Sequence, residues 1–238
     1  MAESFLVDDG RVRGLDLHRR RFERGCADAG VRPERPLTAV AAELPPAGRW
    51  FPRIDVGAAG AVHVATRPAP AREASVVAWV FPGPDPRRAP RRKGPDLARL
   101  GALRAEAARH GAGEAVLGDG HGRLLEGAYT SLLWWEGDVL WAVPDDAPIL
   151  DGVTRRLLLD LAAAEGVVVR YRRPAPAELD GREVWLTSAL HGIRGVTAST
   201  AAACLRAGPA RRAAAWQARL EALAVPIGAL GQGSGASR

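Results

Sequence analysis

Lysine is almost missing from this 238-residue chain, because Lys93 is the only one among 33 lysine and arginine residues. Cysteine is also scarce: Cys26 and Cys204 are the only two, and no Cys-x-x-Cys or Cys/His spacing suited to zinc occurs. These absences exclude a disulfide framework and a structural zinc site and indicate a reducing compartment. No run approaches ~18 apolar residues, and the acidic N-terminus lacks the features of a signal peptide. We therefore expect a soluble, cytoplasmic protein.

The composition is that of a globular protein, since 47% of the residues are hydrophobic and 25% are charged. A chain of this length buries a substantial core and suffices for one large domain or two small ones. Its net charge of +6 suggests at first a nucleic-acid or membrane-surface partner. However, the basic cluster at 87–93 is broken by proline and has no aromatic stacking pattern beside it. Expected strands contain Trp134, Trp135, Trp141 and Trp185, which we expect in the core. Nucleic-acid binding therefore stays only as an alternative, and we expect neither a nucleic-acid nor a membrane partner.

Hydrophobic periodicity predicts a small α+β domain over residues 1–85. A helix is expected over Leu17–Ala29, with the side chain of Asp16 as its cap, and a second helix over Leu37–Leu44. Short valine-rich stretches bounded by Gly and Pro predict strands at Trp50–Val56, Ala61–Thr66 and Ser75–Phe81.

A stretch rich in proline and arginine, residues 86–92, is the expected linker to a larger mixed α and β domain over residues 93–227. The helices expected there are Leu97–His110, Val153–Glu165 and Ala210–Ala224. The expected strands are Glu114–Leu117, Arg123–Leu125, Leu132–Trp135, Val139–Val143, Val167–Tyr171, Glu183–Leu186 and Ile193–Thr197. The glycine- and serine-rich tail, residues 228–238, is expected to be flexible.

Several common catalytic motifs are absent. A Walker A loop needs Gly-Lys-[Ser/Thr], and Lys93 instead stands between Arg92 and Gly94. No G-x-G-x-x-G follows an expected strand, and neither H-E-x-x-H nor G-x-S-x-G occurs. The sequence therefore gives no sign of a P-loop, a dinucleotide-binding turn, a zinc peptidase site or a nucleophile elbow.

Lys93 is the first candidate catalytic residue. A partly desolvated lysine amine can act as a nucleophile, as a Schiff-base partner and as a base, whereas arginine keeps its proton and forms no imine. Its retention in a chain that otherwise uses arginine suggests a chemical role. The alternative is that Lys93 is the last surface lysine of an arginine-biased composition.

Two further segments can hold charged groups of a ligand. Gly152-Val153-Thr154 opens an expected helix, where unpaired N–H groups and the helix dipole favour an anion such as phosphate. The alternative is an ordinary helix start capped by Asp151. Glu126 lies between apolar and small residues and can hold a protonated heterocyclic nitrogen. The alternative is an exposed glutamate in a turn.

Taken in order, these segments resemble the class IV family of enzymes that depend on pyridoxal 5′-phosphate (PLP). This family contains branched-chain and D-amino-acid aminotransferases and aminodeoxychorismate lyase. The resemblance extends to about Val196. It is carried by the opening Ser-Phe-Leu-Val-Asp-Asp-Gly stretch with His18 and Arg21, by Arg-Lys-Gly-Pro-Asp-Leu at 92–97, by Leu125-Glu126-Gly127, by residues 149–155, and by Thr187-Ser188-Ala189-Leu190-His191.

The resemblance implies a two-domain α+β fold of type IV, similar to D-amino-acid aminotransferase, with PLP as cofactor and a homodimeric assembly. It implies that Lys93 forms the Schiff base and moves protons, that Arg21 contacts the PLP phosphate, and that Glu126 pairs with the pyridine nitrogen. The other implied cofactor-binding residues are Gly152, Val153, Thr154, Thr187 and Ser188. The expected substrate contacts are Ser4, Tyr129, Ser131 and His191.

The sequence also departs from the family pattern. It begins inside the N-terminal pattern, and Ala98 stands where many members have a tyrosine that bonds the ring oxygen of the cofactor. Ser131 replaces an asparagine, and Asp151 replaces a proline. These departures leave open a non-catalytic descendant that keeps the fold for binding.

The resemblance favours one reaction by a small margin. The Ser188-Ala189-Leu190 segment is closer to the version found in aminodeoxychorismate lyases. Ser4 stands near the sequence position at which the family has a hydroxyl residue implicated in lyase proton transfer. We therefore expect a lyase that acts on a small amino substrate and releases pyruvate and 4-aminobenzoate. The alternative is an aminotransferase that moves an amino group between an amino acid and a 2-keto acid.

Overall fold

The computed structural model describes residues 1–200 and 205–228, so Cys204 and residues 229–238 of the expected tail lie outside the described residues. The described chain forms two compact units. The first consists of residues 1–71, 92–94 and 221–228, and the second consists of residues 72–91, 95–200 and 205–220.

These units differ in their bounds from the expected domains. Residues 72–85 belong to the second unit, because strand β7 (Ser75–Pro84) pairs with β8 (Glu114–Gly118) and β14 (Gly192–Ser199) of that unit. Residues 92–94 belong to the first unit, where the Ala2 N–H donates to the Lys93 carbonyl at 2.9 Å. The chain therefore passes between the units at several places and not only near residues 86–92.

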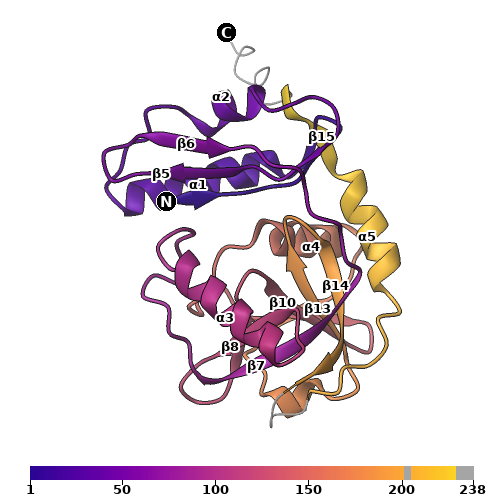
Figure 1. The fold of residues 1–238 in the computed structure, drawn as a ribbon. Helices are drawn as coiled ribbons and strands as arrows, with labels where there is room; N and C mark the ends of the chain where they lie inside the picture. Colours follow the sequence, from indigo (N-terminus) through magenta and orange to yellow (C-terminus); the bar gives the residue numbers. More distant parts are fainter. Residues whose placement is uncertain (201–204, 229–238) are drawn as a thin grey trace. The chain divides into compact units, whose positions relative to one another are not determined.

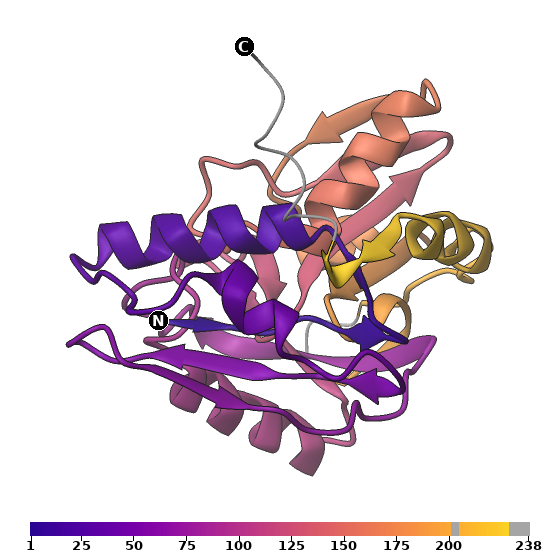
Figure 2. The ribbon, with the colours of Figure 1, turned by 90° about the horizontal axis from the view of Figure 1, so that it is seen from above.

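The first unit contains a three-stranded antiparallel sheet in the order β1 (Ala2–Glu3), β5 (Arg53–Val56), β6 (Val62–Ala65). Helices α1 (Leu15–Asp28) and α2 (Leu37–Ala42) lie on one side of this sheet (Figure 2). Apolar side chains recur at helical spacing on both helices and alternate along β5, so each element presents one apolar face. The resulting core includes Phe5, Leu15, Phe22, Cys26, Leu37, Val40, Ile54 and Val56.

A small second sheet of the first unit leads into α1. Its strand order is β15 (Ala224–Pro226), β3 (Arg11–Arg13), β2 (Val7–Asp8), β4 (Arg49–Trp50). The β2–β3 hairpin turns at Asp9-Gly10 with positive φ angles of 45° and 69°, as a two-residue hairpin of the primed type requires. The expected cap of α1 is wrong: Gly14, with a left-handed backbone, occupies the cap position, and Asp16 bonds Arg19 within the first turn.

The second unit is built on an eight-stranded sheet. Its order is β12 (Val169–Tyr171), β11 (Val139–Ala142), β10 (Ser131–Glu136), β13 (Glu183–Ser188), β14, β7, β8, β9 (Leu124–Gly127). Because β9 also pairs with β10, the strands from β10 round to β9 close into a ring (Figure 1). Alternate residues of these strands fill the ring, and this core includes Val76, Ala78, Val116, Leu132, Trp134, Val184 and Leu186.

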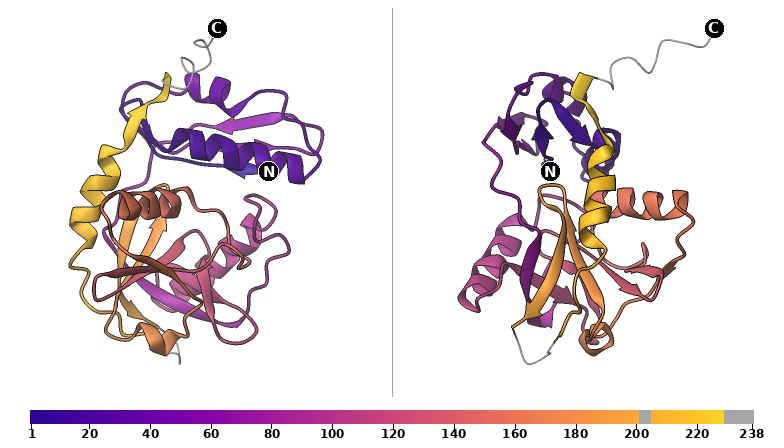
Figure 3. Two further views of the ribbon diagram at one scale, coloured as in Figure 1. Left: turned by 180° about the vertical axis from the view of Figure 1, so that it is seen from behind. Right: turned by 90° about the vertical axis from the view of Figure 1, so that its right-hand side faces the viewer.

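Helices cover the outside of this sheet. Helix α3 (Leu97–Arg109) packs on β7 and β8 through Leu100 and Ala107, while α4 (Val153–Ala164) packs against β10 and β13. Figure 3 shows α3 and α4 on opposite sides of the sheet. A further helix, α5 (Ala213–Ala222), places Trp216 against Trp135 and Trp185.

The expected helices and strands are confirmed to within a few residues. Trp134, Trp135 and Trp185 lie in the core as predicted, whereas Trp141 is only partly buried and packs against it. A one-turn 3-10 helix, Pro176–Leu179, precedes β13. None of the helices in residues 1–200 and 205–228 is both long and apolar enough to cross a membrane.

Candidate active site

A buried carboxylate organises the functional side chains of the first unit. Glu3, on β1, is fully buried, and its Oε1 accepts hydrogen bonds from Arg21 Nη2 at 2.6 Å and from Lys93 Nζ at 3.2 Å. Arg21 Nε donates to Oε2 at 3.0 Å, so the guanidinium holds both carboxylate oxygens. His18 Nδ1 lies 3.3 Å from Oε1. The structure therefore brings together two predicted site residues, Arg21 and Lys93, around an acid that was not predicted.

Local backbone geometry fixes this cluster. His18 and Arg21 are three residues apart on α1, so both point from the same buried face of the helix. Lys93 is tied to β1 by the hydrogen bond from Ala2, and the following Gly94 has a φ of +133°. A Cβ atom at Gly94 would lie 2.9 Å from the Ala2 nitrogen, so only glycine allows the chain to approach β1 this closely.

The charges in this cluster depend on one another. Burial lowers the pKa of Lys93 below its usual value, with Arg21 adding to the effect and Glu3 opposing it. Burial alone would raise the pKa of Glu3, but Arg21, Lys93 and His18 hold it well below its ordinary value. Burial also lowers the pKa of His18 to about 4, so His18 is neutral at pH 7. The cluster thus contains a lysine amine that loses its proton more easily than a surface lysine.

Three predicted residues of the second unit lie side by side on neighbouring strands. In the register of the sheet, Ser131 on β10 faces Glu126 of β9 on one side and Thr187 of β13 on the other. The Thr187 hydroxyl donates to the Ser131 carbonyl at 3.4 Å, and all three side chains are buried.

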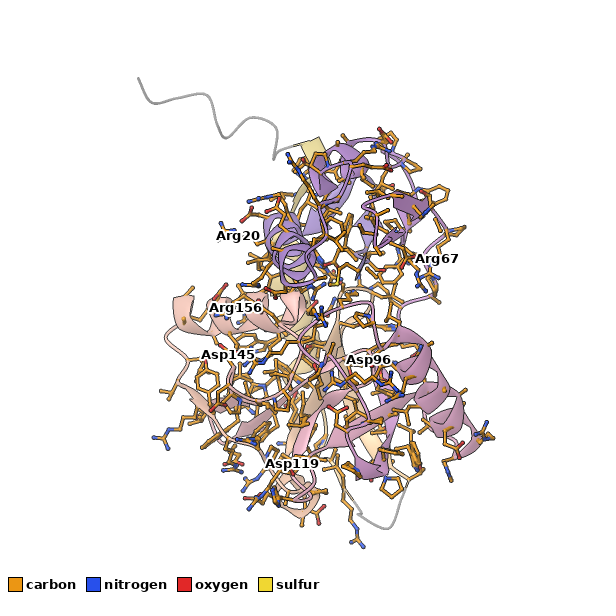
Figure 4. The ribbon with its side chains drawn as sticks, turned by 90° about the vertical axis from the view of Figure 1, so that its left-hand side faces the viewer. Arg20, Arg67, Asp96, Asp119, Asp145 and Arg156 are labelled. Atoms are coloured by element: carbon orange, nitrogen blue, oxygen red, sulfur yellow. The ribbon has the colours of Figure 1, made fainter. Side chains whose placement is uncertain are left out.

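The start of α4 lies against Ser131. Gly152 is the N-cap of α4, and a Cβ atom there would collide with the Ser131 hydroxyl. The N–H groups of Val153 and Thr154 belong to the first turn, which has no intrahelical acceptors for them. The buried Arg155 anchors the helix start, because it donates to the Val143 carbonyl and pairs with Asp145 at 2.8 Å. Asp145 also pairs with Arg156, and both residues are labelled in Figure 4. Glycine, buried hydroxyls and the amides of the first turn thus lie close together, an arrangement of groups that can hold an anion.

Glu126 is the acidic group of this region. Its Oε1 accepts hydrogen bonds from Arg87 Nη1 at 2.5 Å and from the Leu150 N–H at 2.8 Å. Burial raises the pKa of Glu126 to about 7, although Arg87 and the Leu150 amide oppose the rise. Glu126 is therefore buried among charged and polar partners, and the alternative of an exposed turn glutamate is wrong.

The remaining predicted site residues are Ser188, His191 and Tyr129 of the second unit and Ser4 of the first. The Ser188 hydroxyl accepts a hydrogen bond from the His191 N–H at 3.2 Å, and His191 Nδ1 accepts one from the Glu73 N–H at 3.1 Å. Tyr129 is 43% exposed, with the Arg104 guanidinium 4.7 Å from its ring centroid. Ser4, next to Glu3, donates from its hydroxyl to the Glu3 carbonyl at 2.8 Å.

Sequence reasoning missed two residues, Glu3 and Arg87. Glu3 stands in a short stretch with no pattern of its own, and its contact with Lys93 spans 90 residues. Arg87 belongs to the basic cluster that was interpreted as linker, yet its side chain is only 4% exposed. Arg91 of the same cluster donates to the Asp145 and Asp146 carbonyls. The cluster is therefore not one solvated basic patch, which removes the main support for nucleic-acid binding.

The sequence matches the model of a known protein family. A family model described as amino-transferase class IV matches residues 1–199, which is most of the chain. No protein with a curated description matches.

Solved structures with the same fold include both aminotransferases and a lyase. A hypothetical aminotransferase from Mycobacterium tuberculosis, bound to α-ketoglutarate and PMP, is 24% identical with a TM-score of 0.78, over 94% of this chain and 88% of the other. A branched-chain aminotransferase from Thermoproteus uzoniensis with norvaline is 17% identical with a TM-score of 0.79, over 95% and 89%. A protein from Legionella pneumophila, whose proposed activity is that of a 4-amino-4-deoxychorismate lyase, is 16% identical with a TM-score of 0.78, over 94% and 90%.

Proposed function

Because the chain belongs to the class IV aminotransferase family of PLP-dependent enzymes, we propose that it acts on an amino substrate through Lys93 as an aminodeoxychorismate lyase-like enzyme. The observation that carries this proposal is the Lys93 amine, which is the only lysine of the chain, is largely buried, and is held by the Glu3 carboxylate. The enzyme class and its cofactor follow from the family, whereas the reaction and the residue roles are our proposal.

The residues present suit PLP. The cofactor needs an amine, a partner for its ring nitrogen and a place for its phosphate. Lys93 supplies an amine with a lowered pKa. Glu126 supplies a buried carboxylate. Gly152 and the first turn of α4 supply free amides at a position where a larger residue would collide with Ser131. When bound, PLP withdraws electrons from the carbon next to the substrate nitrogen, which makes a proton on that carbon removable.

Lys93 is proposed to attach the cofactor and then to move a proton of the substrate. A lysine is nucleophilic only without its proton, so burial, which lowers the pKa of Lys93, favours both steps. Arg21 is proposed to bind phosphate, and its two hydrogen bonds to Glu3 fix the plane of its guanidinium. In the second unit, Val153, Thr154, Thr187 and Ser188 are proposed as the other cofactor contacts.

The choice of the lyase reaction is based on two features. The Ser188-Ala189-Leu190 segment ends β13, beside the paired Ser131 and Thr187. The Ser4 hydroxyl lies next to Glu3, the residue that bonds Lys93, and can take part in proton transfer. In this reaction aminodeoxychorismate loses its enolpyruvyl side chain as pyruvate, and the ring becomes aromatic as 4-aminobenzoate.

An aminotransferase is the second candidate, because the fold is shared with enzymes such as the branched-chain aminotransferase from Thermoproteus uzoniensis. The same residues would then serve transfer of an amino group to a 2-keto acid. Tyr129 and His191 are the proposed substrate contacts in either case. We also propose a cytoplasmic homodimer.

The first experiment concerns Lys93. We expect the protein incubated with PLP to show a visible absorption band, and borohydride to fix the cofactor on Lys93, as located by peptide mass spectrometry. Lys93→Ala should lose the band, and Lys93→Arg is the matched control, because it keeps the charge but forms no imine. A band that survives in Lys93→Ala would overturn the proposal.

A second assay separates the reactions. Pyruvate release from aminodeoxychorismate identifies the lyase, and amino transfer to a 2-keto acid identifies the aminotransferase. Protein that binds PLP at Lys93 but is silent in both assays is the non-catalytic descendant.

A further inference from the structure

Arg87 forms a buried ion pair with the carboxylate that the proposed function assigns to the cofactor ring. The side chains of Arg87 and Glu126 are each only 4% exposed, and Nη1 of Arg87 lies 2.5 Å from Oε1 of Glu126. The Leu150 N–H donates to the same Oε1 at 2.8 Å. One oxygen of Glu126 thus accepts from two donors, and its contact with Arg87 is shorter than an ordinary N–H···O hydrogen bond.

Arg87 is itself held rigidly. Its Nε donates to both carboxylate oxygens of Asp85 at 2.9 and 3.0 Å, and its Nη2 donates to Asp85 Oδ2 at 2.7 Å and to the Pro148 carbonyl at 3.0 Å. The backbone after it is fixed as well, because the amides of Arg88 and Ala89 donate to Asp96, which is labelled in Figure 4. The guanidinium therefore has one orientation relative to Glu126.

The charges of this triad do not balance. When Glu126 is ionised, Asp85 and Glu126 carry two negative charges against the single positive charge of Arg87, and these are the charged groups that act on the Glu126 carboxyl. The ion pair between Arg87 and Asp85 is already neutral. A second buried carboxylate beside this pair costs desolvation energy without being required for charge balance. Asp85 alone would neutralise Arg87, so the surplus negative charge at Glu126 suits a ligand cation.

From this geometry we propose that Arg87 is a positioning residue, which holds Glu126 in one orientation as the anionic partner of the cofactor ring nitrogen. The proposal rests on the proposed function of Glu126 and adds a role for Arg87 and Asp85. Burial raises the pKa of Glu126 to about 7 in spite of Arg87, so removing Arg87 would raise the pKa further and leave Glu126 protonated at neutral pH. A neutral carboxyl group binds a protonated ring nitrogen less strongly than a carboxylate does.

The test compares two ligands that differ only at the ring nitrogen. The protein free of cofactor is titrated with PLP and with its carbocyclic analogue, in which CH replaces the ring nitrogen, and binding is followed by quenching of tryptophan fluorescence. We expect Arg87→Met to weaken binding of PLP by roughly tenfold to a hundredfold. Binding of the analogue should change much less, because it makes no bond to Glu126.

The pH dependence provides a readout that a merely structural role would not move. In the wild type, the preference for PLP over the analogue should fall as the pH drops through about 7, where Glu126 takes up a proton. In Arg87→Met this fall should occur at higher pH. Equal losses for both ligands, or an unmoved pH profile, would overturn the proposal.

Two controls keep the outcome decisive. Arg194→Met breaks another buried ion pair of the second unit, that with Glu114, and should leave the preference for PLP unchanged. If Arg87→Met binds neither ligand, Arg87→Lys decides: a reduced preference supports the proposal, and an unchanged one contradicts it. Wild-type protein that binds no PLP would instead reject the proposed function itself.

Discussion

At the residue scale, Glu3 influences the pKa of Lys93 and the orientation of Arg21. It raises the pKa of Lys93 against the effect of burial, and it aligns Arg21 through two hydrogen bonds. The Glu3 carboxylate orients the amine of Lys93, the proposed catalytic residue, but it also stabilises the protonated form of that amine, which is not nucleophilic. The lowered pKa of Glu3 shows that the cations around it prevail.

Removing the charge of Glu3 should make Lys93 more reactive. In Glu3→Gln the pKa of Lys93 should fall, because the effect of the anion is lost while burial and Arg21 remain. We expect severalfold faster labelling of Lys93 by an amine reagent near pH 8, which mass spectrometry assigns without ambiguity because Lys93 is the only lysine. Glu23→Gln, which changes an exposed acid on α1, is the matched control. Slower labelling in Glu3→Gln would contradict this account.

The buried His18 predicts a loss of stability in mild acid. Its pKa of about 4 lies below the value of about 6.5 for an exposed histidine, so the unfolded chain takes up a proton first as the pH falls. The His18 contribution is therefore complete above pH 6.5 and is lost toward pH 4. Between pH 7 and pH 5 this amounts to roughly 2 kcal/mol.

Urea unfolding at the two pH values checks this prediction. His18→Gln should reduce the pH dependence of the free energy of unfolding. The pH dependence that remains includes the contribution of His191, whose pKa is also lowered to about 4 by burial. An unchanged slope in His18→Gln would show that His18 does not carry the effect.

At the scale of elements, the start of α4 depends on Gly152. The helix cap is close to Ser131 on β10, so any side chain at this position must displace the serine hydroxyl. The start of the helix, the strand and the amides proposed to bind phosphate are thus in direct contact. A substitution here acts on the fold and on the proposed phosphate contacts together.

Gly152→Ala should reduce stability by roughly 1 kcal/mol and weaken PLP binding, since the displaced Ser131 hydroxyl has no room in its buried setting. Gly120→Ala is the matched control, because no atom lies within 4 Å of the added Cβ and the change should be nearly neutral. Thermal unfolding and PLP titration of both variants provide the measurements. Recovery of stability in Ser131→Ala/Gly152→Ala would confirm the steric cause, and equal losses in both single variants would argue against it.

The sequence predicts helices and strands better than it predicts side-chain contacts between residues far apart in the chain. Helices and strands follow from local periodicity, and the apolar and small residues beside Glu126 in the sequence are consistent with its burial. The cap of α1 was missed because Asp16 is a good capping residue, whereas the left-handed turn at Gly14 depends on the preceding hairpin. Glu3 and Arg87 were missed because their contacts, with Lys93 and Glu126, join residues 90 and 39 positions apart.

At the scale of the whole molecule, the preference for arginine has a structural meaning. Arginines stack on tryptophans, as Arg172 does 4.4 Å from the Trp141 ring centroid, and they reach backbone carbonyls from buried positions, as Arg155 does. A planar guanidinium makes these contacts better than a lysine ammonium. The net charge of +6 therefore reflects internal contacts as well as the surface, and the one lysine is left as the one side-chain amine.

The discontinuity of the first unit has a consequence for how the chain folds during synthesis. Its strand β3 pairs with β15, and Arg11 bonds the Ala224 carbonyl from 213 residues away. The chain leaves the ribosome N-terminus first, so β3 is made long before its partner β15. Closing such long loops costs entropy before any contact repays it. The second unit, whose strands lie between residues 75 and 199, can therefore form before the unit that contains Glu3 is complete.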